Sequence, residues 1–151
     1  MVISTLNIKL LEDRLGFISH AVERMKRLAA LREEVFLSGE NPAAAESYLR
    51  RTLEAMFDIG RHITARMAGK GIVEYKDIAR ALCDHGIVRK DSADTLVLMA
   101  GYRNRLVHFY HEITERELYR ILSSNLSDIE DFSKQIANFL SSLPNEAKLQ
   151  A

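Results

Sequence analysis

The sequence contains few of the residues that break or cross-link a chain. Its 151 residues include one cysteine, two prolines and seven glycines. A β-sandwich or barrel needs a turn signal about every 8–12 residues, so these numbers favour an all-helical chain. The single cysteine, Cys83, excludes an intramolecular disulfide framework. It fits a reducing compartment, where a lone thiol usually behaves as a small buried hydrophobe.

An excess of charge and a long apolar run are lacking as well. Lysine and arginine together number 21, as do aspartate and glutamate, so no global positive field attracts nucleic acid and any such binding needs a local patch. No segment approaches the roughly 18 uncharged residues of a membrane span, and residues 1–14 show no secretory pattern. We therefore expect a cytoplasmic protein that does not enter a membrane. A glycine-rich phosphate loop is also missing, which leaves NTP hydrolysis without support.

What the sequence does contain is a series of amphipathic helices. With 47% hydrophobic residues, the chain matches one globular domain large enough to bury a core. We place this domain at residues 1–144 and expect a flexible C-terminal tail at residues 145–151. The apolar residues recur at intervals of three and four. They predict an all-α, up-down antiparallel helical bundle with one short extra helix.

Local signals set the boundaries of the first three helices. We expect the first over residues 3–37. Gly39 is placed to end that helix, and Asn41-Pro42 is placed to begin the second. The second helix is expected to stop at Gly69-Lys70-Gly71, and a shorter helix follows over residues 75–84. Apolar residues predict the inner face of the second helix: Leu49, Leu53, Met56, Ile59 or Gly60, and Ile63.

Two further helices complete the predicted bundle. Asp91 or Ser92 is a suitable N-cap for a fourth helix, which runs through Arg103 and beyond. Thr114 and Glu117 have the spacing of a capping box for a fifth helix, which ends at Leu143-Pro144. The buried stripe of the fifth helix is predicted to be Leu118, Leu122, Leu126, Ile129, Phe132, Ile136 and Phe139.

Polar side chains of unusual kinds gather in the segment from Tyr102 to His111. On an undistorted helix, at about 100° per residue, five of them share an arc of about 160°. Leu106 and Phe109 are expected to point the opposite way, into a core. Lys and Glu would serve solubility better, so the arc indicates a site, with a purely structural role as the alternative. Its members are Arg103, Asn104, His108, Tyr110 and His111.

Within this arc, Arg103, His108 and Tyr110 follow the pattern R-x4-H-x-Y. The pattern resembles the signature of HepT-like toxins in the HEPN superfamily, including the polar residue, Asn104, directly after the arginine. Residues 58–63 resemble the family's second-helix segment, and the order of helices is similar over nearly the whole chain. The resemblance implies a HEPN-like helical domain and a metal-independent endoribonuclease (RNase) that needs no cofactor. It also implies a homodimer in which the two motifs form one cleft.

The residues fit that chemistry. Metal-free RNA cleavage uses the ribose 2′-hydroxyl to attack the adjacent phosphorus. It therefore needs a group that moves the proton, a cation for the phosphorane and a group that orients them. His108, Arg103 and Asn104 can supply these three functions, since an imidazole exchanges protons near neutral pH and a planar guanidinium matches phosphate oxygens. The resemblance further implies that a cognate MntA-type nucleotidyltransferase adenylylates Tyr110, which would place a phosphate beside Arg103.

Two other sets of residues are weaker candidates. His108 and His111 stand at the i,i+3 spacing of a helical metal pair, but a third ligand at defined spacing is missing, so we predict no metal. Several basic residues could form the local patch that RNA needs, although charges on a helix are most often its solvated face. They are Arg50, Arg51, Arg61 and Arg66, with His62 beside them, and Arg105.

Two classes of function remain open at this point. In the first, the chain is an endoribonuclease toxin of a type VII-like toxin–antitoxin module, and its nucleotidyltransferase partner restrains it by AMPylation (adenylylation). In the second, it is a non-catalytic dimeric binding or substrate subunit of a small nucleotidyltransferase, and the polar arc is a docking surface. The presence of Arg103, Asn104 and His108 together favours the first. A cleavage assay with purified protein separates them.

Overall fold

The computed structural model of the protein describes residues 5–68, 71–144 and 148–149. None of the described helices combines the length and apolar character that a membrane span requires. The elements follow in the order β1 (Leu6–Asn7), α1 (Ile8–Ala29), α2 (Glu33–Phe36), α3 (Asn41–Ala68), α4 (Tyr75–Asp84), η1 (Lys90–Ser92), α5 (Ala93–His108), η2 (Tyr110–Glu112), α6 (Glu115–Ser124), α7 (Leu126–Ser142) and β2 (Lys148–Leu149).

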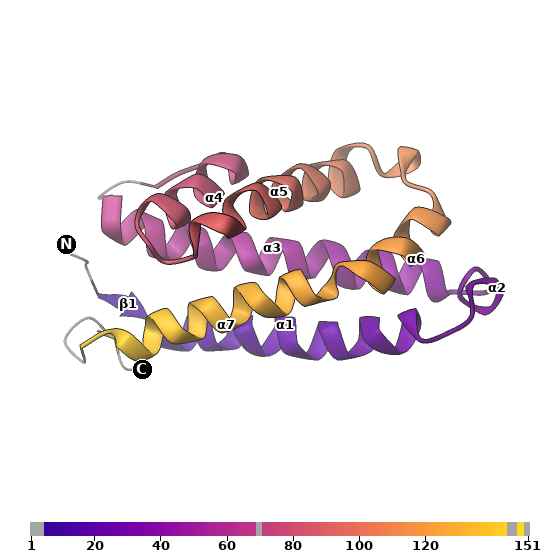
Figure 1. The fold of residues 1–151 in the computed structure, drawn as a ribbon, viewed down its shortest axis with the longest axis horizontal. Helices are drawn as coiled ribbons and strands as arrows, with labels where there is room; N and C mark the ends of the chain where they lie inside the picture. The colour runs from indigo at the N-terminus through magenta and orange to yellow at the C-terminus, as the bar shows by residue number, and fades with distance from the viewer. Residues whose placement is uncertain (1–4, 69–70, 145–147, 150–151) are drawn as a thin grey trace.

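Helix α3 lies at the centre of an up-down bundle. It packs against α1, α4, α5 and α6. Figure 1 shows α1 and α7 on one side of it and α4 and α5 on the other, with the long helices running back and forth along one axis. The predicted all-α antiparallel bundle is confirmed, and α4 is its short extra helix.

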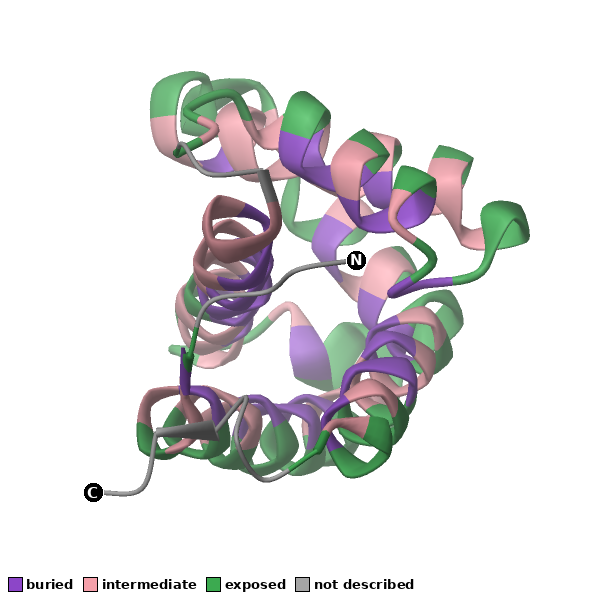
Figure 2. Ribbon diagram, turned by 90° about the vertical axis from the view of Figure 1, so that its left-hand side faces the viewer, coloured by how far each residue is buried: buried purple, intermediate pink, exposed green. Residues whose placement is uncertain are grey.

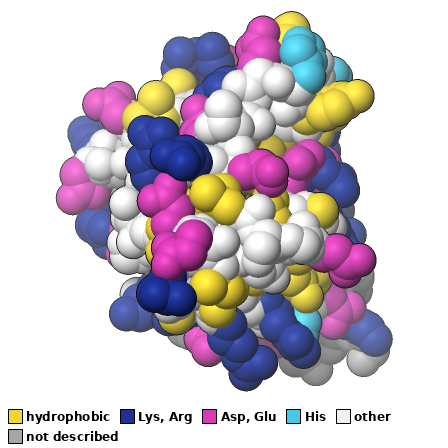
Figure 3. Space-filling model, turned by 90° about the vertical axis from the view of Figure 1, so that its right-hand side faces the viewer, with side chains coloured by type: hydrophobic (Ala, Val, Ile, Leu, Met, Phe, Trp, Pro, Cys, Tyr) yellow, Lys and Arg dark blue, Asp and Glu magenta, His cyan; other side chains and the backbone are white. Residues whose placement is uncertain are grey.

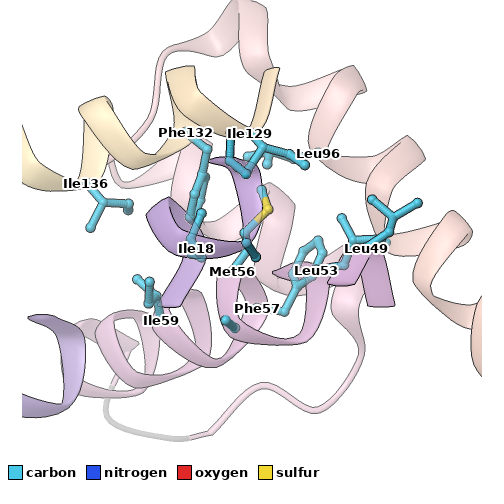
Figure 4. Close-up of a cluster of buried hydrophobic side chains, with 14 of the residues drawn as sticks. Ile18, Leu49, Leu53, Met56, Phe57, Ile59, Leu96, Ile129, Phe132 and Ile136 are labelled. Carbon is cyan, nitrogen blue, oxygen red and sulfur yellow. The ribbon is translucent and has the colours of Figure 1, made fainter. Parts of the chain in front are cut away.

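The hydrophobic core is made by the apolar stripes that the sequence predicts. Side chains from α1, α3, α5 and α7 point into it (Figure 4), and the exposed faces of the helices turn outward (Figure 2). Fully burying a side chain of this size contributes about 1.5–3 kcal/mol. The core residues labelled in Figure 4 are Ile18, Leu49, Leu53, Met56, Phe57, Ile59, Leu96, Ile129, Phe132 and Ile136, all buried.

The first helix begins later and ends earlier than expected. Asn7 caps its start, because its Oδ1 accepts a hydrogen bond from the Leu10 N–H at 3.1 Å. The helix stops at Ala29, and Arg32 is extended, with φ −64° and ψ 151°. At this break the Tyr119 hydroxyl, from α6, donates a 2.6 Å hydrogen bond to the Leu31 carbonyl. The stabilising contact is distant in sequence, so local signals do not reveal it.

The predicted fifth helix is two helices, α6 and α7, separated at Asn125. That residue has φ −118° and ψ 0°, at the C-cap of α6 and the N-cap of α7. Leu122 and Leu126, on either side of the break, are both buried. The apolar spacing therefore continues across the break, which is why the sequence predicts a single helix. Half of the predicted capping box is present at the start of α6, since Thr114 Oγ1 accepts from the Glu117 N–H at 3.1 Å. The Glu117 carboxylate bonds to Tyr102 and Arg105 instead.

The two ends of the chain meet at one end of the bundle. Leu6 pairs with Lys148 and Asn7 with Leu149 in a short parallel bridge, so residues 148–149 of the expected flexible tail are held against β1. Residues 145–147 and 150–151 of that tail lie outside the described residues. The same holds for the expected helix start at residue 3 and for Gly69-Lys70 of the expected stop after the second helix.

Candidate active site

Arg103 and Asn104 lie in the last third of α5, where the helix packs on α3 and α4. The Arg103 side chain is 20% exposed, and its Nη2 lies 3.7 Å from Glu54 Oε1 on α3. Its Nη1 donates a 3.3 Å hydrogen bond to Asn104 Oδ1. Its Cζ lies 4.5 Å from the centre of the Tyr75 ring at the start of α4. Three helices therefore hold this guanidinium.

The neighbouring side chains do not satisfy all the hydrogen-bond donors of Arg103. Its Nε is buried and has no hydrogen-bond partner in the described part of the chain. The Glu54 contact, at 3.7 Å, is an ion pair longer than a hydrogen bond. Moreover, Glu54 Oε1 is shared with Arg50 Nη1 at 3.6 Å. The Nη1 and Nη2 groups of Arg103 carry two N–H bonds each and have one partner each. They therefore keep donors for a phosphate, whereas the buried Nε does not face solvent.

Sequence reasoning missed Glu54 and Tyr75. A signal for Glu54 does exist, because this carboxylate stands within an apolar run in which Ala55, Met56 and Phe57 are all buried. A charge in such a setting needs a partner. Tyr75 gave no comparable signal, because its contact with Arg103 depends on how α4 packs against α5.

His108 is the last residue of α5, and its side chain is exposed. The structure gives it no hydrogen bond or ion pair with Arg103 among the described residues. Leu106 is buried as predicted. The prediction that Phe109 points into the core is wrong, since Phe109 is 50% exposed. The reason is that the helix ends there, with φ −131° and ψ 35° at Phe109.

Tyr110 and His111 do not continue the helical face of Arg103. They lie in the short 3-10 turn η2, so the expectation that an undistorted helix brings Tyr110 onto the Arg103 face is wrong. The two rings contact each other edge to face, with centroids 6.0 Å apart. Tyr110 is 62% exposed. Its ring therefore projects into solvent just beyond the C-terminus of α5.

The predicted basic residues are divided among several places. Arg50 shares the Glu54 carboxylate with Arg103. Arg61 shares the Tyr75 ring with Arg103, and the centre of that ring is 5.4 Å from Arg61 Cζ. Arg105 pairs with Glu117. Arg51 lies over Phe17 of α1, and Arg66 donates to the His62 carbonyl one turn earlier in α3. Arg51 also lines one hollow with Glu54 and Asp58, the carboxylates that pair with Arg50, Arg61 and Arg103.

His62 is not a cation of the predicted basic patch. Its Nε2 accepts a 3.0 Å hydrogen bond from the Asn7 N–H, which requires the nitrogen to be unprotonated. Burial, and secondarily the nearby Arg66, lower the pKa of His62 below its ordinary value of 6.5. His62 therefore ties the N-terminal segment to α3 in its neutral form.

We expect this hydrogen bond to make stability depend on pH. A lowered pKa in the folded state means that the unfolded chain binds the proton first, so His62 stabilises the fold fully above 6.5 and less as the pH falls below that value. Urea unfolding from about pH 8 to about pH 5 measures the loss. His62→Gln keeps an acceptor without titrating, so its free energy of unfolding should lose less. Equal losses in the two proteins would contradict the assignment.

Neither a reactive cysteine nor a cluster of metal ligands is found in the described part of the chain. Cys83 is 7% exposed, and burial raises the pKa of its thiol, so the reactive thiolate is disfavoured. Among the described residues, no three His, Cys, Asp or Glu side chains come together as a metal-binding group.

Comparison with known proteins identifies the family to which this chain belongs. The sequence model of the "Ribonuclease HepT-like" family matches residues 18–136, and the chain belongs to this family. It is 26% identical over 139 residues to the tRNA nuclease HepT of Aphanizomenon flos-aquae, covering 91% of this chain and 94% of that protein. It is 32% identical over 85 residues to the mRNA nuclease HepT of Shewanella oneidensis, covering 56% and 63% of the two chains.

Solved structures share the fold. The cytosolic Bacillus subtilis protein YutE superimposes with a TM-score of 0.79 at 22% identity, over 97% of this chain and 98% of that one. The tri-AMPylated Shewanella oneidensis HEPN toxin, in complex with its MNT antitoxin, gives a TM-score of 0.76 at 21% identity, over 85% and 97%. The HEPN-like helical fold expected from the motif is thereby confirmed.

Proposed function

We propose that this protein is a metal-independent endoribonuclease toxin of a two-component toxin–antitoxin module. The observation that carries the proposal is the state of Arg103, which is held by Tyr75 and Asn104 and only loosely paired with Glu54. It lies on the same helix as the exposed His108. A cation with free donors and an imidazole that can move a proton are the groups that metal-free RNA cleavage requires.

In the proposed reaction, the 2′-oxygen forms a bond to the adjacent phosphorus while the bond from phosphorus to the 5′-oxygen breaks. His108 moves the proton from the 2′-hydroxyl, and the leaving 5′-oxygen gains a proton. Arg103 binds the phosphate oxygens and stabilises the negative charge of the phosphorane. Asn104 keeps the guanidinium in place through its 3.3 Å hydrogen bond. The products are a 2′,3′-cyclic phosphate and a free 5′-hydroxyl.

The test is incubation of the purified protein with RNA in the presence of EDTA. The proposal expects cleavage that EDTA does not reduce. The non-catalytic alternative, a docking or substrate subunit for a nucleotidyltransferase, expects no cleavage that depends on Arg103 and His108. Relatives support the first, since two of them are named nucleases and a structural neighbour is a toxin bound to its antitoxin.

The proposed enzyme acts as a homodimer. Cleavage is best served by both a base and an acid, and one protomer offers a single exposed motif imidazole. At about 100° per residue, Leu98, Gly101 and His108 fall within about 80° of one another on α5. Leu98 is 74% exposed, and a Cβ at Gly101 would meet no atom within 4 Å. A protruding leucine beside a glycine suits close packing of two α5 helices around a two-fold axis.

Leu98→Glu should therefore dissociate the dimer and lower the rate of RNA cleavage at least tenfold, because a buried charge opposes its own copy across a two-fold axis. Light scattering at micromolar concentration and a cleavage assay measure the two effects. Val73→Glu is the matched control for the oligomeric state, since Val73 is 79% exposed and lies outside α5. A stable wild-type monomer, or a Leu98→Glu protein that remains dimeric, contradicts this part of the proposal.

A further inference from the structure

One aromatic ring contacts two arginines from different helices. The centre of the Tyr75 ring lies 4.5 Å from Arg103 Cζ on α5 and 5.4 Å from Arg61 Cζ on α3. The same ring stacks on Phe57, with centroids 4.9 Å apart and an interplanar angle of 11°. Phe57 is buried. The core therefore fixes the orientation of the ring that both cations share.

We propose that Tyr75 is a positioning residue that holds Arg61 and Arg103 together as a two-cation site for a backbone phosphate of RNA. This inference rests on the proposed function and extends it, since it assigns Arg61 to the same substrate strand as Arg103. Two guanidiniums can engage two oxygens of one phosphate or two successive phosphates. The chemical class of the ligand is a phosphodiester in either case.

The ring is suited to this task because it does not neutralise the cations. A carboxylate between two arginines cancels charge and occupies N–H donors. An aromatic face attracts a guanidinium through its quadrupole and leaves the N–H edge free for a phosphate. The Tyr75 ring therefore contacts both cations without occupying their N–H donors.

The surrounding ion pairs leave an excess of positive charge. Asp58 is shared by Arg14, at 3.4 Å, and Arg61, at 3.7 Å. Glu54 is shared by Arg50 and Arg103. Four arginines thus meet two carboxylates along this part of α3, in a chain whose formal net charge is zero. Arg61 is also directed by its Nε, which donates to the Ile72 carbonyl at 3.4 Å.

A glycine in the middle of α3 lies against α4, the helix that carries Tyr75. A Cβ at Gly60 would lie 2.7 Å from Ile78 Cγ2 and 3.0 Å from Leu82 Cδ1 of α4. A side chain at this position would force the Ile78 and Leu82 side chains of α4 to shift. A glycine inside a helix is unfavourable by itself, so its position calls for a packing reason. Gly60 thus allows the close packing of α3 and α4, and Tyr75 is the first residue of α4.

The first experiment measures phosphate binding without cleavage. The probe is a 2′-O-methyl oligoribonucleotide, which cannot undergo 2′-hydroxyl attack, and its Kd is measured by fluorescence anisotropy over a range of salt concentrations. Arg61→Gln should reduce the slope of log Kd against log salt by about 0.7, the value for one phosphate contact on a single strand. The control is Arg24→Gln, because Arg24 is exposed on α1. Figure 1 shows α1 on the opposite side of the bundle from α4 and α5.

The second experiment tests the ring. Tyr75→Phe retains the aromatic face and should restore most of the binding and cleavage that Tyr75→Leu loses. Tyr75→Leu should lower kcat at least tenfold and weaken oligonucleotide binding, because neither cation is then held. If Tyr75→Leu does not fold, as judged by its melting curve, the salt slope of Arg61→Gln decides alone, since Arg61 is a half-exposed surface residue.

Two results overturn the proposal. One is an unchanged salt slope in Arg61→Gln, as in Arg24→Gln, and the other is a folded Tyr75→Leu protein that cleaves like Tyr75→Phe. Failure of the proposed function looks different. If the wild-type protein binds the probe with a salt slope that Arg61→Gln reduces and yet never cleaves unmodified RNA, the two-cation site stands and the protein is not a ribonuclease.

Discussion

Alanine at His108 or at Arg103 is expected to abolish RNA cleavage and growth inhibition. General acid–base catalysis by one side chain contributes about 10²–10⁴-fold. Removing one group that stabilises developing negative charge costs about 10²–10³-fold in kcat. Each single variant should therefore lose at least a hundredfold in kcat on an RNA substrate. The loss should fall in kcat more than in KM, since both groups act on the transition state.

The two variants differ in what they should do to stability. His108 is exposed at the end of α5, so its replacement should change the free energy of unfolding by less than about 0.5 kcal/mol. Arg103 is half-buried against Tyr75 and Glu54, and alanine there removes packing as well as charge. Arg103→Lys keeps the charge without the planar fork. It should remain folded and still lose most of the activity. A large fall in the melting temperature of His108→Ala would favour a structural role instead.

Two controls separate this mechanism from a metal-dependent one. His111→Ala should retain activity, and EDTA should have no effect on the wild type. If His108 and His111 held a metal ion, His111→Ala and EDTA would both inactivate the protein. Asn104→Ala should lose less activity than either main variant, because Asn104 acts on Arg103 through one 3.3 Å hydrogen bond.

Local signals in the sequence identified much of the fold. Tyr75–Asp84 was predicted as the short helix, and α4 spans these residues. Thr114 caps α6 as its spacing to Glu117 predicts. These signals succeed because caps and apolar stripes act within a few residues. At the break after Ala29, the Leu31 carbonyl accepts a hydrogen bond from Tyr119, 88 positions further along the chain, and no local pattern reports such a bond.

The candidate site likewise has a part that the sequence reveals and a part that only helix packing creates. Arg103, Asn104 and His108 stand within six residues of one another, so their motif is visible in the sequence. The groups that orient Arg103 come from other helices, Glu54 from α3 and Tyr75 from α4. Their contacts exist only once the helices pack. The predicted shared face of Arg103 and Tyr110 failed because α5 ends at His108.

The surface near the end of α5 bears on how a partner would reach the site. Figure 3 shows the end of the molecule where the α5–α6 connection lies. Charges of both signs are mixed over this face, and histidine and hydrophobic side chains gather at its top. Phe109 and Tyr110 are the exposed aromatic side chains among the described residues. Tyr110 is thus accessible from solvent, whereas Arg103 stays half-buried.

The other tyrosines are less accessible from solvent than Tyr110. Tyr102 donates its hydroxyl to Glu117 at 3.1 Å, and burial, followed by the Glu117 carboxylate, raises the pKa of Tyr102. Tyr119 donates to the Leu31 carbonyl. Tyr75 is stacked on Phe57, and Tyr48 is half-buried. Tyr110 combines an exposed ring with a position two residues beyond His108.

We therefore expect that co-expression with a cognate nucleotidyltransferase adds one or more AMP units to Tyr110 and abolishes RNA cleavage. In the first transfer, the phenol oxygen of Tyr110 bonds to the α-phosphorus of ATP, and the bond from that phosphorus to the oxygen bridging the β-phosphate breaks. Pyrophosphate leaves, and the phenol proton passes to the transferase. Any later AMP bonds in the same way to a hydroxyl of the AMP already attached. The product places a negative phosphate and an adenosine beside the end of α5, where they repel the RNA backbone and obstruct His108. Inhibition is then both electrostatic and steric.

Intact-mass analysis after co-expression measures this switch. The wild type should gain mass in multiples of AMP, Tyr110→Phe should gain none, and Tyr48→Phe, a matched change at a half-buried ring, should be modified like the wild type. Tyr110→Phe should also escape inhibition and continue to cleave RNA beside its partner, because removing one hydroxyl from an exposed ring leaves Arg103 and His108 untouched. A partner that neutralises the toxin without any change of mass would show that binding alone is sufficient, and the modification at Tyr110 would not be the switch.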